Sequence, residues 1–174
     1  MELYHGTNNL FDEFSNEFLS SENSIDQYGS GFYFYSDKSK TALHGGLRVY
    51  ADVTIKKAVE YTANIRLTRK NIESLILSCP NLEYCLENYG EIDHEGFDKV
   101  LKRAVDSYIG LHFLDCLNCL GNDFFPGNDC HILLSKFAEI KGIDCITDKS
   151  RDIYVILTKK QITITKVIAE QEDN

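Results

Sequence analysis

The chain has 174 residues, 43% hydrophobic and 26% charged, a composition typical of one globular domain with a sizeable core. Its formal net charge of −9 repels phosphate backbones and argues against broad, nonspecific binding to nucleic acid. No apolar run approaches the roughly 20 residues that span a bilayer, and no basic segment precedes an apolar one at the N-terminus. We therefore expect a cytoplasmic protein that does not contact membranes.

The six cysteines occur without an export signal, so we expect them to be reduced and mostly buried. Cys116 and Cys119 have the spacing of a zinc site, and His112, Cys130 and His131 are nearby in the sequence. The surrounding run reads as a helix, however, in which positions three apart simply share a face. No second pair of this kind follows, so we expect no metal site.

Hydrophobic periodicity and turn residues predict elements along the whole chain. In chain order we expect a strand at 2–6, a loop at 8–30, a strand at 31–36, a short helix at 37–45, a strand at 47–55, helices between about 66 and 141, and strands at 142–147, 152–157 and 161–168. Strands at both ends with helices between them predict an α+β domain.

Several residues mark the ends of these elements. Ser36 or Asp37 can cap the short helix, Thr68 can cap the first longer helix, and Asp129 can cap the last one. We expect one helix to begin at Asp93 and to bury a single apolar stripe. Residues on this stripe are Phe97, Val100, Leu101, Ala104, Val105 and Tyr108.

Two short motifs point to a site. The first strand ends in His5-Gly6-Thr7, which places an imidazole, a bare backbone and a hydroxyl at one strand end. About 25 residues later, Gly29 and Gly31 lead into Phe-Tyr-Phe-Tyr, where alternation puts Tyr33 and Tyr35 on one face and the two phenylalanines on the other.

This pair of motifs resembles the ADP-ribosyltransferases of the diphtheria-toxin and PARP-like branch, especially small bacterial and phage members found in toxins and polyvalent proteins. A third match covers Tyr154, Val155, Gln161 and Ile162 without a gap. The resemblance implies a single domain over residues 1–174, built on an ADP-ribosyltransferase-like split β-sheet. It leaves a helical insertion at about 66–141 without any matching motif.

The resemblance also implies that NAD is the substrate and assigns residues to it. His5 would bond a ribose hydroxyl, Gly6 would bond the carboxamide through its backbone, and Thr7 would reach the adenosine side. Gly31 would let the backbone approach the ligand closely, and the ring of Tyr33 would stack on the nicotinamide.

Further along the second motif, Thr41 falls where a hydroxyl meets the carboxamide, and His44 falls where a second aromatic ring would complete a sandwich with Tyr33. The position of the usual catalytic Glu holds Ile153 instead. A carboxylate from Asp152, after a bulge, or from Asp148 could supply the missing charge.

The resemblance therefore predicts a mono-ADP-ribosyltransferase, toxin-like or effector-like. It would transfer ADP-ribose from NAD to a protein or nucleic-acid acceptor, and an antitoxin or similar partner could neutralise it. Because the usual Glu is missing, a catalytically inactive module of the same fold, acting through NAD or protein binding, stays open. A transferase acting on the 2′-phosphate of tRNA is a weaker alternative, because no Arg cluster lies beside the motifs.

Overall fold

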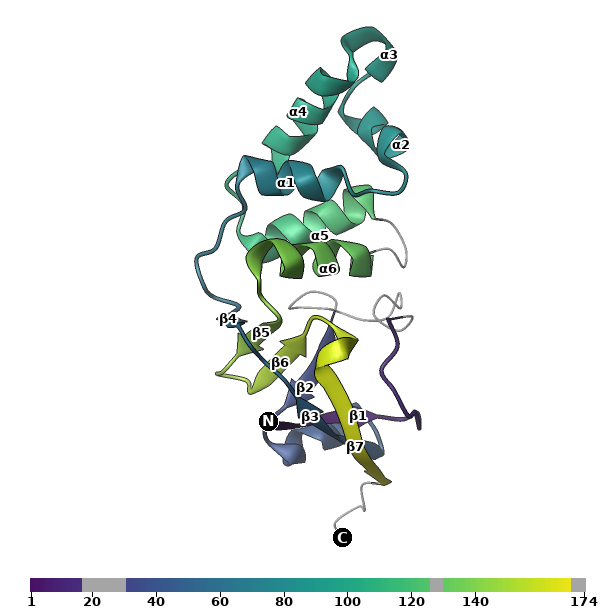
Figure 1. Cartoon of the computed structure of the whole chain (residues 1–174), viewed down its shortest axis with the longest axis vertical. Coiled ribbons are helices and arrows are strands. Elements are labelled where there is room, and N and C mark those ends of the chain that lie inside the picture. The colour runs from purple at the N-terminus through teal and green to yellow at the C-terminus, as the bar shows by residue number, and fades with distance from the viewer. Residues whose placement is uncertain (17–30, 126–129, 170–174) are drawn as a thin grey trace.

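The computed structural model describes residues 1–16, 31–125 and 130–169. In these residues the chain is an α+β protein, with a mixed sheet of seven strands at one end and stacked helices at the other (Figure 1). The α+β class predicted from the sequence is confirmed.

Strands form close to where the sequence patterns placed them. Their bounds are β1 Glu2–Thr7, β2 Phe32–Tyr35, β3 Leu47–Val53, β4 Ala58–Glu60, β5 Cys145–Asp148, β6 Ile153–Ile156 and β7 Ile162–Ala169. The three-residue strand β4 was not predicted, because a run that short carries no measurable alternation.

The helices are short and occupy most of the middle of the chain. Their bounds are η2 Lys38–His44, α1 Arg69–Ile76, α2 Leu82–Leu86, η3 Glu87–Tyr89, α3 Ile92–Glu95, α4 Phe97–Tyr108, α5 Phe113–Phe124, α6 Cys130–Lys141 and η5 Lys159–Gln161, where η marks a 3₁₀ helix. None of the described helices is long and apolar enough to cross a membrane.

The order of strands in the sheet is β4-β5-β6-β2-β1-β3-β7. Only the β4–β5 pair is parallel, and every other neighbouring pair is antiparallel. The order places β2 at the centre and β1 beside it, between β2 and β3. Strands from the two ends of the chain thus lie side by side.

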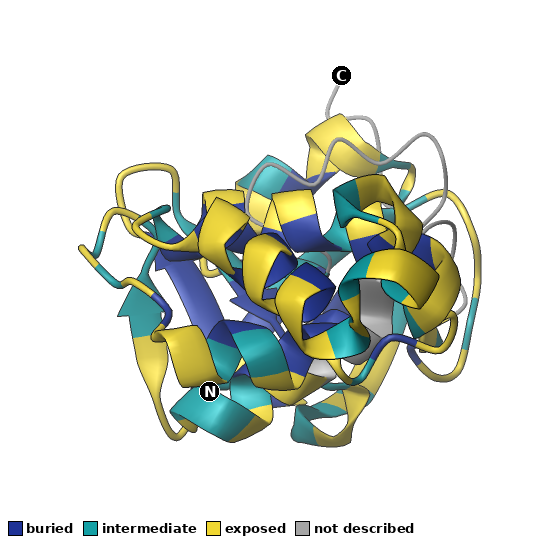
Figure 2. Cartoon of the chain, turned by 90° about the horizontal axis from the view of Figure 1, so that it is seen from above, coloured by how far each residue is buried: buried dark blue, intermediate teal, exposed yellow. Residues whose placement is uncertain are grey.

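A hydrophobic core covers each face of the sheet, and Figure 2 shows the buried residues running beneath the helices. On one face, Ile146 and Val155 pack into the same cluster as the helices. On the other face, Phe32 and Phe34 pack with Leu3 and strand β3. The predicted alternation along β2 is therefore confirmed.

Local signals explain two of the helices well. Thr68 caps α1, because its Oγ1 accepts a hydrogen bond of 3.2 Å from the backbone N–H of Asn71. The predicted stripe is buried on α4, apart from Phe97, which packs at the edge of the cluster. Its spacing of three and four residues keeps these side chains on one face.

Two helix boundaries differ from the prediction. The helix expected from Asp93 is broken at Gly96, whose φ of 87° is incompatible with a continuing α-helix, so α3 and α4 are separate. The helix expected at about 111–120 continues to Phe124, because Leu120 and Phe124 extend its buried face. The proposed cap Asp129 lies outside the described residues.

Candidate functional site

The three matched segments form three neighbouring strands. The order β6-β2-β1 brings the C-terminal match beside the Phe-Tyr-Phe-Tyr run, and that run beside the strand ending in His5-Gly6-Thr7. Tyr35 pairs with Ile153 of β6 on one side and with Tyr4 of β1 on the other. Segments more than 100 residues apart therefore meet at one place in the sheet.

Strands β1 and β2 separate soon after they meet. Tyr4 and Tyr35 are their only paired residues in the described chain, whereas β1 continues along β3 through Thr7. The side chain of His5 crosses to the other strand, and its Nδ1 lies 2.8 Å from the carbonyl oxygen of Tyr33. A carbonyl can only accept, so Nδ1 carries the proton and donates it. The imidazole thus bridges the two separating strands.

The ring of His5 packs among aromatic side chains. Its centroid lies 5.2 Å from that of Phe14, 5.7 Å from that of Phe34 and 6.2 Å from that of Phe11. Burial lowers the pKa of His5, and the nearby His44 lowers it further, although the bond to the Tyr33 carbonyl opposes both effects. The imidazole is therefore neutral at physiological pH.

The side chains of His5 and Tyr33 lie on opposite faces of the sheet. The Tyr4–Tyr35 register sets His5 across from Phe34, on the face away from the helices. Tyr33 instead packs against the helical cluster. The structure joins these two residues through a hydrogen bond but does not bring the imidazole and the phenol onto one surface.

The face that carries Tyr33 also carries a row of four residues, one from each of four neighbouring strands. The registers place Asp148 beside Ile153, Ile153 beside Tyr35, and Tyr35 beside Tyr4. Neighbouring residues in such a row have Cβ atoms roughly 5 Å apart. The candidate site is therefore the helix-side face of β5, β6, β2 and β1, bounded by η2.

Helix η2 lies over Gly6. A Cβ on Gly6 would be 2.2 Å from the carbonyl oxygen of Thr41 and 2.9 Å from the Cβ of His44. A Cβ on Gly31 would be 2.4 Å from Cγ1 of Val155. Both glycines are thus needed for close packing within the protein, and the space beside each is already filled.

Thr41 is fully buried at the inner side of η2. Its Oγ1 donates to the carbonyl of Lys38 at 2.7 Å and accepts from Nε of Arg48 at 2.8 Å. Its hydroxyl is therefore used inside the protein. Thr7 is similarly occupied, since its Oγ1 accepts a bond of 3.1 Å from the backbone of Asn9.

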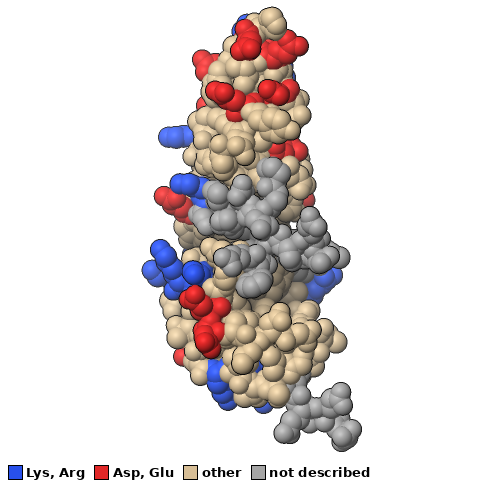
Figure 3. Space-filling model, turned by 90° about the vertical axis from the view of Figure 1, so that its right-hand side faces the viewer, with Lys and Arg blue, Asp and Glu red and all other residues tan. Residues whose placement is uncertain are grey.

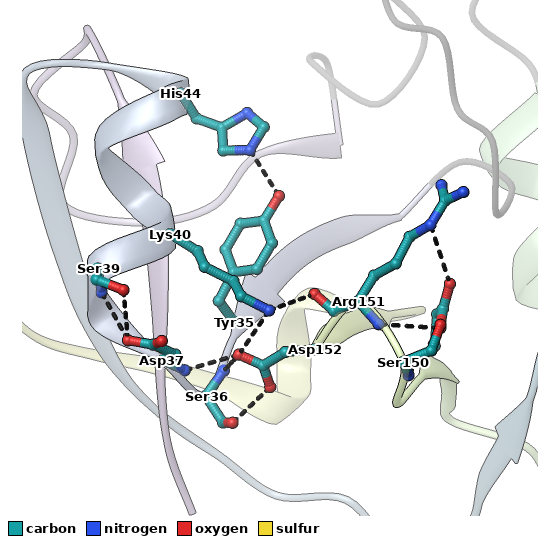
Figure 4. Close-up of polar contacts among 10 residues, drawn as sticks. Tyr35, Ser36, Asp37, Ser39, Lys40, His44, Ser150, Arg151 and Asp152 are labelled. Carbon is teal, nitrogen blue, oxygen red and sulfur yellow. Dashed lines mark hydrogen bonds and ion pairs between the residues drawn. The ribbon is translucent and has the colours of Figure 1, made fainter.

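His44 pairs with Tyr35 and not with Tyr33. The His44 Nε2 lies 2.6 Å from the Tyr35 hydroxyl, and the two rings are stacked with centroids 5.3 Å apart (Figure 4). Burial and the charge of Asp152 raise the pKa of Tyr35, so its phenol stays protonated. Alternation along β2 had already placed Tyr35 on the face of Tyr33, but no sequence motif paired it with His44.

Asp152 connects the start of β6 to the start of η2 (Figure 4). Its carboxylate accepts hydrogen bonds from the backbone of Ser36 at 3.1 Å, the backbone of Asp37 at 2.8 Å and the hydroxyl of Ser36 at 2.5 Å. Lys40 Nζ lies 3.9 Å away. Both oxygens are engaged, and a φ of 61° turns the residue out of the strand. The arrangement assigns Asp152 to positioning η2.

Asp148 is the other carboxylate near Ile153, and it is only 1% exposed. Its Oδ1 accepts hydrogen bonds from the backbone N–H of Ser150 at 3.0 Å and of Arg151 at 3.2 Å, which closes the turn between β5 and β6. Its Oδ2 lies 3.8 Å from Nε of Arg151. Asp148 shares the face of Ile153 and is the nearest cross-strand carboxylate to it.

The cysteine motif of α5 does not form a site in the described residues. Cys116 is buried and Cys119 is exposed, so the two thiols point to different surroundings. The N–H of Leu114 bonds to Nδ1 of His112, which caps the helix. Among the residues that the structure describes, no cluster of three or more His, Cys, Asp and Glu could hold a metal ion.

Comparison with known proteins adds little to this geometry. The sequence matches no protein-family model and no curated protein. Among solved structures, the crystal structure of an anti-CRISPR protein is similar, with a TM-score of 0.42 and 12% identity over 97% of this chain and 95% of that chain. A similarity of this size supports no conclusion about fold or function.

Proposed function

We propose that this protein is a mono-ADP-ribosyltransferase that uses NAD and modifies a macromolecular acceptor. One observation carries the proposal: three motif-bearing segments, from the start, the second strand and the end of the chain, occupy the adjacent strands β1, β2 and β6. The separation of β1 from β2 supports an ADP-ribosyltransferase-like split sheet. The helix of the second motif, η2, packs against β1 beside it.

The reaction would need a group that stabilises positive charge on the ribose carbon. Ile153 cannot provide it, and Asp152, which a φ of 61° turns out of the strand, is held against Ser36 and Asp37. Asp148 is the better candidate, because it lies across from Ile153 on the face of Tyr33 and Tyr35. Its Oδ1 accepts a hydrogen bond from the backbone of Ser150 and so holds the turn, while its Oδ2 lies 3.8 Å from Nε of Arg151.

The acceptor is more compatible with a protein than with a nucleic acid. The net charge is −9, and Figure 3 shows acidic side chains gathered at the helical end of the molecule. Such a surface repels a phosphate backbone. Basic residues near the site, such as Lys40 and Arg151, are engaged by Asp152 and Asp148.

Incubation of the purified protein with labelled NAD and a cell lysate tests the proposal. Label should appear on lysate protein, and Tyr33→Ala and Asp148→Asn should each lower it by at least tenfold. Asn keeps an oxygen that can hold the turn at position 148, so lost label would report lost charge. The matched control is Tyr84→Ala, which changes a tyrosine that is 74% exposed on the helical end. Equal label in wild type and both site variants would reject the proposal.

The catalytically inactive module is the second candidate, and the replacement of the expected Glu by Ile153 favours it. Two measurements together separate the two functions: NAD binding by calorimetry, and the transfer of label from NAD to lysate protein. Binding of NAD without nicotinamide release would support a binding module. If the protein neither binds NAD at millimolar concentration nor transfers label, the result would support a module that acts through protein contacts alone.

A further inference from the structure

Tyr35 and His44 form a pair that no motif predicted. Their hydrogen bond of 2.6 Å and the stacking of their rings fix the orientation of the imidazole through Nε2. Tyr35 is 8% exposed, whereas His44 is exposed. The hydrogen bonds found among the described residues leave Nδ1 of His44 without a partner. One imidazole nitrogen is thus anchored while the other can meet a molecule that approaches from solvent.

The pair borders the position from which the usual carboxylate is missing. Tyr35 is the direct cross-strand partner of Ile153, and both lie on the helix-side face of the sheet. An isoleucine can neither accept a proton nor carry charge. A second proton acceptor beside this position would therefore supply chemistry that Ile153 cannot.

We infer that His44, oriented by Tyr35, is the general base that activates a neutral hydroxyl side chain of an acceptor protein. The inference rests on the proposed transferase function. It also narrows the acceptor, because a carboxylate acceptor would need no base, whereas a hydroxyl gains nucleophilicity when its proton is removed.

The step balances within the reaction. The acceptor oxygen forms a bond to C1′ of the ribose, and the bond from C1′ to the nicotinamide nitrogen breaks. Nicotinamide leaves with that electron pair as a neutral molecule, and the hydroxyl proton moves to Nδ1 of His44. The Nε2–H of the resulting imidazolium donates to the Tyr35 hydroxyl oxygen, which accepts it because the raised pKa of Tyr35 keeps a neutral phenol there. Water later removes the proton.

The test compares His44→Gln, His44→Ala and Tyr35→Phe with wild type, with His94→Gln as the control. His94 is exposed on α3, where it pairs with Glu91. Three quantities are measured with labelled NAD and lysate protein: NAD affinity by calorimetry, nicotinamide release, and transferred label. Imidazole is added to the alanine variant, because the exposed position lets a free imidazole replace the side chain.

In His44→Gln we expect transferred label to fall about 100-fold, in the range of general base catalysis. Nicotinamide release should fall far less, because water can still react. Imidazole should restore label to His44→Ala by at least tenfold, and Tyr35→Phe should lose about tenfold. Unchanged label in His44→Gln, or no rescue of His44→Ala by imidazole, would overturn this inference and leave the proposed transferase function standing. A wild-type protein that releases no nicotinamide would reject the proposed function and this inference with it.

Discussion

At the scale of single residues, His5 shows how a motif can be matched while its geometry differs. Its imidazole is part of the sheet's own bonding, since Nδ1 donates to the Tyr33 carbonyl where β1 and β2 separate. Removing this donor would break a partly buried hydrogen bond between the two strands. His5 therefore has a structural role whether or not NAD binds.

The lowered pKa of His5 predicts a pH-dependent stability. Because the folded-state pKa lies below the unfolded value of about 6.5, the unfolded chain binds protons more readily. Stability is complete above pH ~6.5 and is lost as pH falls from there toward the folded-state pKa. The slope reaches at most about 1.4 kcal/mol per pH unit for one proton.

Urea denaturation between pH 7.5 and 5 measures this slope. His5→Asn should flatten it, because the amide can donate to the Tyr33 carbonyl but does not titrate. His94→Asn, at an exposed position, should keep the wild-type slope. Equal slopes in wild type and His5→Asn would show that His5 does not cause the dependence.

At the scale of elements, η2 is fixed at both ends. Asp37 caps its start by accepting a 2.9 Å bond from the backbone of Ser39, and Asp152 holds Ser36 and Asp37 from across the sheet. At its other end, Gly6 lets the helix approach β1 closely. This fixed position is what keeps His44 stacked on Tyr35.

Substitutions at Asp152 should distinguish the contribution of its carboxylate hydrogen bonds to stability from the contribution of its backbone conformation. Asp152→Ala loses the carboxylate and keeps a φ of 61°, so we expect a loss of about 1–3 kcal/mol in unfolding free energy. Asp152→Gly should lose less, because glycine tolerates this φ, and Asp152→Asn should lose least. Urea denaturation gives the order. An alanine variant as stable as wild type would contradict the role of Asp152.

The sequence predicted individual helices and strands better than it predicted how distant elements contact one another. Period-two alternation correctly separated Tyr33 from Phe34, and the spacing along α4 correctly identified its buried stripe. Sequence could not place His5 relative to Tyr33, because their faces depend on the Tyr4–Tyr35 register, a long-range property. The bonds of Asp152 to Ser36 span 116 positions and leave no local signal.

At the scale of the whole molecule, one core joins the helices to the sheet. Ile146 and Val155 belong to the same cluster as the buried residues of α1, α4 and α5. No described element of the helical layer has a separate core of its own. The helices and the sheet should therefore unfold together.

Ile146→Ala tests this coupling. Ile146 is fully buried, so we expect a loss of about 2–5 kcal/mol, with tyrosine fluorescence and far-ultraviolet circular dichroism shifting to the same lower midpoint. Ile168→Ala is the matched control, because this side chain on β7 is 39% exposed and should change stability little. Two separate transitions in Ile146→Ala would indicate that the helices fold independently.

The strand order has a consequence for how the protein is made. Strand β1 lies inside the sheet and leaves the ribosome first, yet the sheet also requires β5, β6 and β7, the first of which begins 138 residues after β1 ends. Until then β2 and β3 each lack a neighbour and expose aromatic and β-branched side chains. Nascent chains that stall before Cys145 should therefore require chaperones to avoid aggregation.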